Sequence, residues 1–149
     1  MKKTVSILSM LVIAVGICLY MASCRTSYKP LLHSQEGINF KVTTLADARQ
    51  SAEAQNKPLF VFAHASWCPT CKKMEQEVLI QKELGAAYNQ DFVNVAIDID
   101  SPDGKELQKI YPIRATPTLF FFNKGGNIAK KIEGYTTAEK LLAEAKTIK

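Results

Sequence analysis

Two cysteines separated by two residues are the part of this sequence best suited to chemistry. Cys68 and Cys71 flank Pro69-Thr70 and can close a small disulfide ring, so they can exchange two electrons with another disulfide. The apolar run at 59–63 before them predicts a buried strand, and a helical pattern follows them. We therefore expect the first thiol at a helix N-terminus, where the helix dipole and unpaired N–H groups favour a thiolate.

Composition and charge narrow the classes of function. The chain has 149 residues, enough for one domain and an appendage, and its net charge is +5. Without Lys2 and Lys3, 17 basic residues face 14 acidic ones. The basic residues are scattered and do not alternate with aromatic residues, so nucleic-acid binding is not expected.

The first residues form a targeting pattern. Lys2 and Lys3 precede an apolar stretch at 5–20, and the small residues at 22–23 follow it. A positive start, an apolar core and small residues at the end are typical of an export signal. We predict a signal peptide over 1–23.

Cys24 follows the signal directly. The tetrapeptide at 21–24 resembles the lipobox of bacterial lipoproteins, which implies a lipid on Cys24, although Met21 stands where leucine is usual. Two alternatives remain open: an uncleaved signal anchor, since a spanning helix needs about 20 residues, and a cleaved, unanchored form. Each alternative puts the rest of the chain outside the cytoplasm. We expect a membrane-anchored lipoprotein of the bacterial periplasm.

Four cysteines are present, and two of them belong to the export segment. Cys18 lies within its apolar core and Cys24 is the acylation candidate, so only Cys68 and Cys71 are left for redox chemistry. Residues 24–36 lack periodicity and are interpreted as a membrane tether, with the folded domain over 37–149.

The folded part alternates strand and helix patterns. Strands are predicted at 38–42, 59–64, 92–97, 118–122 and 128–132, and helices at 44–56, from the tetrad to about 84, at 101–111 and from 136 or 137 to 148. Alternating strands and helices imply parallel pairing through right-handed crossovers, and the last hairpin adds an antiparallel edge. The prediction is an α/β fold with a mixed sheet and helices on both faces.

Several residues around this frame resemble the thioredoxin superfamily. Trp67 stands before the first cysteine, Asp98 ends the next strand, and Thr-Pro-Thr at 116–118 precedes the hairpin. Gly126 and Gly134 fall at the hairpin and after its second strand. The combination is far more specific than a Cys-x-x-Cys alone.

The resemblance covers 38–149 and implies the thioredoxin fold. It also implies a cis Thr116–Pro117 peptide facing the cysteines, with the backbone of Thr116 pairing with an extended substrate segment. Trp67 would shield the pair and form part of the docking surface, and the alternative role for Trp67 is packing on the sheet.

One departure from the family affects proton transfer. Thioredoxin carries a buried aspartate six residues before the first cysteine, and Phe62 stands there in this chain. Glu75 lies one helical turn after Cys71, so both can share a helix face. The C-terminal domains of the DsbD group have a glutamate at that offset. Glu75 is therefore either a proton acceptor for Cys71 or an ordinary solvated carboxylate.

Histidine could take part either in thiol chemistry or in metal binding. His64 lies four residues before Cys68, where it would either lower the pKa of a thiol as an imidazolium or pack beside the loop; packing is favoured. A structural zinc site needs four ligands, and His33 and His64 are the only histidines. We expect no metal and no organic cofactor.

These residues predict a membrane-tethered, extracytoplasmic thiol–disulfide oxidoreductase. Cys68 would attack a substrate disulfide and Cys71 would resolve the mixed disulfide. The similarity to the DsbD group favours a disulfide reductase acting on disulfide-containing proteins and supplied by an electron donor of the membrane or periplasm. The alternative is a non-catalytic peptide-binding or chaperone module, against which the two intact cysteines argue.

Overall fold

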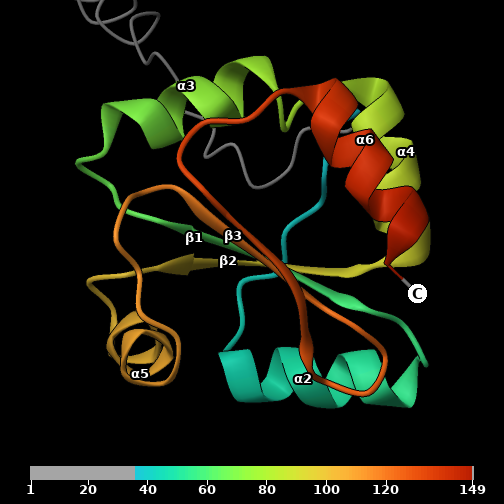
Figure 1. Ribbon diagram of the computed structural model, residues 1–149, viewed down its shortest axis with the longest axis horizontal. Helices are drawn as coiled ribbons and strands as arrows, with labels where there is room; N and C mark the ends of the chain where they lie inside the picture. Colours follow the sequence, from blue (N-terminus) through green and yellow to red (C-terminus); the bar gives the residue numbers. More distant parts are fainter. Residues whose placement is uncertain (1–35, 149) are drawn as a thin grey trace, which may run out of the picture. The chain divides into compact units, whose positions relative to one another are not determined.

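The computed structural model describes residues 36–148, and its elements are labelled as in Figure 1. Along the chain they are α2 (Leu45–Ala54), β1 (Leu59–His64), α3 (Pro69–Glu77), α4 (Lys82–Asp91), β2 (Val93–Asp98), α5 (Pro102–Ile110), β3 (Thr118–Phe122), β4 (Ile128–Glu133) and α6 (Ala138–Thr147). The α/β thioredoxin-like architecture expected from the sequence is confirmed.

Short-range signals define several helix starts. The hydroxyl of Thr44 accepts a hydrogen bond from Asp47 N–H at the start of α2. Ser101 caps α5 in the same way, and Thr137 caps α6. Each cap satisfies an N–H group that has no partner within its own helix.

One mixed sheet holds the fold together in the order β2-β1-β3-β4. β1 and β2 are parallel, whereas β3 is antiparallel to both β1 and β4. The expectation that only the last hairpin is antiparallel was wrong. Figure 1 shows α5 end-on while β1 and β2 run across the view, so α5 crosses the sheet end instead of returning along it. β3 therefore starts at the end where β2 stops.

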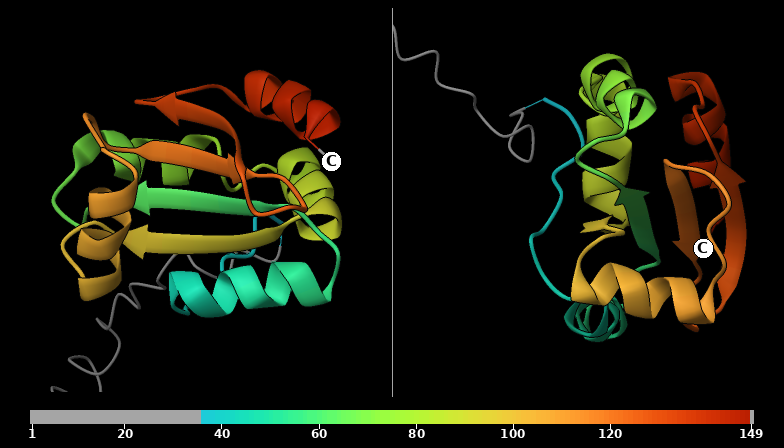
Figure 2. Two further views of the ribbon diagram at one scale, coloured as in Figure 1. Left: turned by 60° about the horizontal axis from the view of Figure 1, so that its bottom comes forward. Right: turned by 90° about the vertical axis from the view of Figure 1, so that its left-hand side faces the viewer.

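Helices cover both faces of the sheet, as Figure 2 shows. Alternate β1 side chains point to opposite faces. Phe60 and Phe62 join the core under α3, α4 and α6, while Leu59 and Val61 join the core under α2 and α5. Because both faces are covered, the β1 residues from Leu59 to Ala63 are all buried.

The first predicted strand is reduced to a single bridge between Lys41 and Val95. The N–H of Ile38 donates to Leu79 O at 2.8 Å, and the N–H of Asn39 donates to the Asn89 side chain. These donors bond to the helical layer, and the pairing of the segment with β2 is limited to Lys41, whose N–H donates to Asn94 O at 2.9 Å.

The single helix predicted after the tetrad is two helices. α3 ends at Glu77, and α4 begins at Lys82 after a break at Val78. The carbonyl of Leu79, in this break, accepts the hydrogen bond from Ile38 instead of continuing a helical ladder. Between residues 36 and 148, no helix has the length and apolar character to cross a bilayer.

Candidate active site

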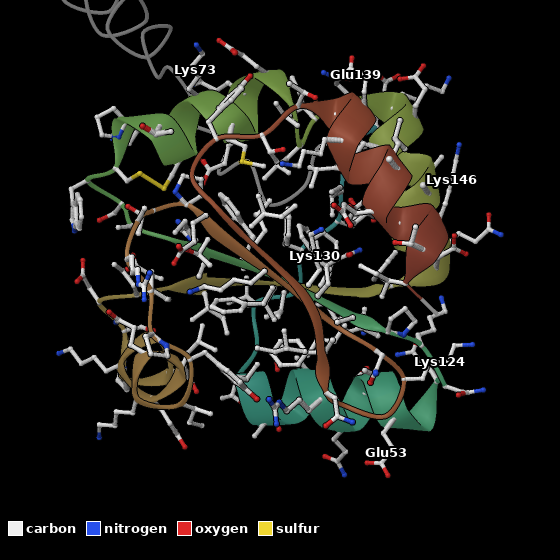
Figure 3. All side chains as sticks on the ribbon, in the orientation of Figure 1. Glu53, Lys73, Lys124, Lys130, Glu139 and Lys146 are labelled. Carbon is white, nitrogen blue, oxygen red and sulfur yellow. A yellow bond between two sulfur atoms is a disulfide. The ribbon has the colours of Figure 1, made fainter. Side chains whose placement is uncertain are left out.

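The two cysteines lie where β1 passes into α3. Cys68 is the N-cap of α3, and Pro69 occupies the first turn, where its missing N–H costs nothing. Cys68 and Cys71 form a disulfide, drawn as the yellow bond beside the start of α3 in Figure 3. The predicted position of the first cysteine at a helix N-terminus is confirmed.

The two sulfur atoms differ in access and in hydrogen bonding. Cys68 is 3% exposed, and Cys71 is 0% exposed. The N–H of Cys71 donates to Cys68 Sγ at 3.1 Å. A thiolate on Cys68 would keep this donor and the positive end of the helix dipole. Cys68 thus keeps a little exposed surface at the helix N-terminus, whereas Cys71 is enclosed behind it.

The loop before β3 faces Cys68. The Thr116–Pro117 peptide is cis, which confirms the expectation. Cys68 Sγ lies 3.5 Å from Thr116 O. The N–H of Gly134 donates to Pro117 O at 2.7 Å, so the segment after β4 supports this loop. The structure therefore brings together three chain segments that the sequence separates widely.

The chain is similar to known proteins over most of its length. The model of the thioredoxin-like domain family matches residues 45–149. The chain belongs to this family. DsbD of Colwellia psychrerythraea, a thiol:disulfide interchange protein, is 31% identical over 116 residues, which are 72% of this chain and 19% of that protein. The chain thus spans about a fifth of that relative.

Solved structures share the thioredoxin-like domain. A candidate disulphide-isomerase from Bacteroides thetaiotaomicron has 33% identity and a TM-score of 0.66, covering 74% of this chain and 92% of its own. The oxidised C-terminal domain of Neisseria meningitidis DsbD has a TM-score of 0.59 at 23% identity, covering 70% and 91%. The second likeness concerns the fold alone.

Trp67 extends the site of this thioredoxin-like domain over its surface. Its side chain is 62% exposed, and its indole N–H donates to Asp100 Oδ2 at 2.7 Å. This exposure argues against the alternative that Trp67 serves only to pack on the sheet. Asp100 was missed in the sequence, although its place just after β2 and the parallel pairing of β1 with β2 put it near the tetrad.

Phe62 occupies the place of the usual thioredoxin aspartate and is 1% exposed. Its ring stacks on His64 with centroids 5.2 Å apart and planes 4° apart. His64 Nδ1 lies 3.7 Å from Glu75 Oε1, and both side chains are about a quarter exposed. Packing of His64 beside the active-site loop is confirmed, but its contact with Glu75 was not predicted.

Burial changes the proton affinity of both groups. It lowers the pKa of His64 below 6.5, against a smaller opposing effect of Asp98. It raises the pKa of Glu75 above 4.5, against a smaller effect of Lys72. Glu75 is therefore not the fully solvated carboxylate of the alternative interpretation.

Tyr135 is an exposed aromatic residue near the site that was not predicted from the sequence. It follows Gly134 and is 41% exposed. Its hydroxyl lies 3.1 Å from Glu77 Oε2, and the amine of Lys73, labelled in Figure 3, lies 5.3 Å from its ring centre. Tyr135 thus joins the segment beside Pro117 to helix α3.

The remaining observations concern the grouping of possible metal ligands and the residues before 36. Within 36–148, no three His, Cys, Asp or Glu side chains gather as a metal site would require. Cys18, Cys24 and His33 lie outside the described residues, as do the signal peptide and nearly all of the tether.

Proposed function

We propose that this protein is an extracytoplasmic thiol–disulfide oxidoreductase that works as a disulfide reductase. The observation that carries the proposal is the Cys68–Cys71 disulfide at the start of α3, with Cys68 facing Thr116 O. A pair with one reachable and one enclosed sulfur suits sequential attack, in which the first sulfur meets the substrate and the second releases it.

The reaction starts from the reduced pair. The Cys68 thiolate attacks a substrate disulfide, forms a mixed disulfide and expels one substrate thiolate. Cys71 then gives up its proton, attacks Cys68 Sγ and expels the second substrate thiolate, leaving Cys68–Cys71 oxidised. Two electrons pass to the substrate, whose thiolates take protons from solvent. We propose Glu75 as the acceptor of the Cys71 proton, because it follows Cys71 by one turn of α3.

Substrate recognition is proposed to use main chain rather than one side chain. Thr116 lies beside the reactive sulfur and can pair with an extended segment through its backbone. Pro117 follows Thr116 in that loop, and the exposed Trp67 ring, next to Cys68 in the chain, provides apolar contact. Disulfide-containing proteins are the proposed substrates.

The reductase direction rests on the resemblance of the Trp-Cys-x-x-Cys-Lys-x-x-Glu pattern to the DsbD group and on the 31% identity to a DsbD protein. A reductant outside the cytoplasm needs a supply of electrons, so a donor in the membrane or periplasm is part of the proposal. We further propose that a lipid on Cys24 tethers the domain. A Cys24→Ala chain should then lose a lipid-sized mass and its membrane retention; retention of both would refute the tether.

The decisive experiment is the reduction potential of the Cys68–Cys71 pair in the full chain, equilibrated with glutathione buffers. Thioredoxin lies near about −270 mV and the oxidant DsbA near about −120 mV. A value near the first supports a reductase, and one near the second contradicts it. Insulin reduction by wild type and by Cys68→Ser separates catalysis from binding. If both were equally inactive but bound peptide, the non-catalytic binding module would replace this proposal.

A further inference from the structure

His64 and Glu75 meet under the active-site helix. His64 is the last residue of β1 and lies on the same face as Phe62, the face that α3 covers. Glu75 reaches it from α3, with 3.7 Å between Nδ1 and Oε1. About a quarter of each side chain remains exposed. The pair thus joins the strand before the tetrad to the helix after it.

Phe62 restrains the imidazole of His64. The two rings are nearly parallel, at 4°, with centroids 5.2 Å apart. A stacked ring has little freedom to turn away from α3. Phe62 also stands where thioredoxin has its buried carboxylate, so this chain lacks that proton acceptor. The same Phe62 ring orients His64 toward Glu75, the other candidate acceptor.

Glu75 is linked to Cys71 by helix geometry. Residues four apart on a helix are neighbours on one face. Cys71 is fully buried, so its proton cannot leave directly to bulk water. A carboxylate that is held near this face and still reaches solvent offers a route for the proton.

Burial brings the two proton affinities of the pair closer together, against smaller opposing effects of the neighbouring charges. Burial lowers the pKa of His64 and raises the pKa of Glu75. Asp98 acts on His64 from β2, where it is the register partner of His64, and Lys72 acts on Glu75 from α3. Two groups whose proton affinities are moved toward each other exchange a proton at lower cost than a fully solvated histidine and glutamate.

We propose that His64 is a positioning residue that holds Glu75 against the Cys71 face of α3, so that the pair takes up the Cys71 proton during resolution of the mixed disulfide. The Cys71 S–H bond breaks and its proton goes to Glu75, whose Oε1 lies 3.7 Å from His64 Nδ1. The new thiolate then forms the bond to Cys68 Sγ as the Cys68–substrate bond breaks. The proton leaves the pair to solvent after the substrate has gone. This inference rests on the proposed redox function.

A variant set separates the nitrogen of His64 from its packing. His64→Phe keeps a ring to stack on Phe62 but removes the contact with the carboxylate, and Glu75→Gln keeps the shape but removes the charge. His64→Asn puts an amide nitrogen near the position of Nδ1. Full-chain variants would be loaded with a peptide mixed disulfide on Cys68, and its release would be followed from pH 5 to 9.

General acid–base groups contribute about 10²–10⁴ in rate, so Glu75→Gln should slow release at pH 7 by about a hundredfold. His64→Phe should slow release by about tenfold and shift the acidic limb of the pH profile, and His64→Asn should restore part of the rate. The double variant should be no slower than Glu75→Gln alone, because His64 acts through Glu75.

A second measurement needs no substrate. In a Cys68→Ser chain, thiolate absorbance reports the pH midpoint of Cys71 ionisation. Glu75→Gln should lower this midpoint because a nearby negative charge is removed, and His64→Phe should shift it only when Glu75 is present. A failure of wild type to reduce any disulfide would refute the proposed function alone. An unchanged midpoint in His64→Phe, or the same shift with and without Glu75, would overturn the positioning role of His64.

Discussion

The two ends of the sheet have the same kind of packing but different electrostatics. At one end, β1 and β2 finish at the register pair His64 and Asp98. At the other, Leu59 pairs with Phe122 and the β3–β4 turn follows. Both ends hold buried aromatic residues in the core.

Their charged groups are placed differently. The end away from the disulfide has a groove of about 330 Å³. Charged side chains line it: Arg49, Glu53, Lys57 and Lys124. Glu53 and Lys124, labelled in Figure 3, are exposed there, whereas His64 and Glu75 are mostly buried at the disulfide end. The two ends therefore differ in which groups are partly buried: a histidine and a carboxylate that face each other near the disulfide, and the cations Arg49 and Lys57 at the other end.

The largest effect should come from removing one aromatic ring at each end. Phe62 and Phe122 are each 1% exposed. Phe62→Ala and Phe122→Ala should each lower the free energy of unfolding by about 3–5 kcal/mol, measured by urea denaturation. Only Phe62→Ala should alter the pH dependence of disulfide reduction, because Phe62 stacks on His64. An equal change of the pH profile in both variants would remove the distinction between the ends.

A smaller effect is expected from two glycines with left-handed backbone. Gly134, near the disulfide, has φ 83°, and Gly126, in the β3–β4 turn, has φ 75°. An added Cβ would meet no atom within 4 Å at either position. Alanine at each should therefore cost about 1–2 kcal/mol from backbone strain alone.

Activity should separate the two glycine variants. The N–H of Gly134 bonds to Pro117 O, so Gly134→Ala should raise the KM for a disulfide substrate by disturbing the loop that faces Cys68. Gly126→Ala should leave KM unchanged and serves as the matched control. Steady-state reduction of a peptide disulfide measures both, and a similar KM in the two alanine variants would contradict the expectation.

The smallest effect is the pH dependence of stability. Because the pKa of His64 is lowered in the folded chain, the unfolded chain protonates His64 at a higher pH than the folded chain does, starting near 6.5. The contribution of His64 is fully present above 6.5 and is lost as the pH falls through the folded pKa. Glu75 changes the free energy of unfolding in the opposite direction. Because its pKa is raised in the folded chain, stability falls as the pH rises from 4.5 through the folded pKa of Glu75.

His64→Phe should therefore lose less stability than wild type when the pH is lowered below 6.5. Urea midpoints at several pH values measure this difference, and Lys57→Gln at the other end should follow wild type. Parallel pH curves for wild type and His64→Phe would show that burial of His64 makes no net contribution.

Local signals made much of the fold predictable. The apolar run of β1, the Ser101 and Thr137 caps and the Gly-Gly turn at 125–126 each act within a few residues, and all lie as expected. The spacing of the tetrad and Thr116-Pro117 predicted their meeting through resemblance to a family. The structure confirms that meeting.

Contacts between residues that are distant in the sequence explain the predictions of the fold and site that were wrong or missing. Nothing in the sequence near Val78 breaks a helix as proline or glycine would, and the α3–α4 break is accompanied by a bond from Ile38, which is distant in the sequence. The antiparallel β3 follows from the direction of α5, which periodicity does not encode. The His64–Glu75 contact depends on how α3 packs on β1, which neither residue's position in the sequence reveals.

The difference in access between the two sulfurs also has a consequence under oxidative stress. Peroxide reaching reduced Cys68, the more exposed sulfur, would convert it to a sulfenic acid. Cys71 lies close enough to form the disulfide, so it condenses with that sulfenic acid, releases water and returns the pair to its ordinary oxidised state. The enclosed thiol thereby protects the outer one from irreversible oxidation to a sulfinic acid.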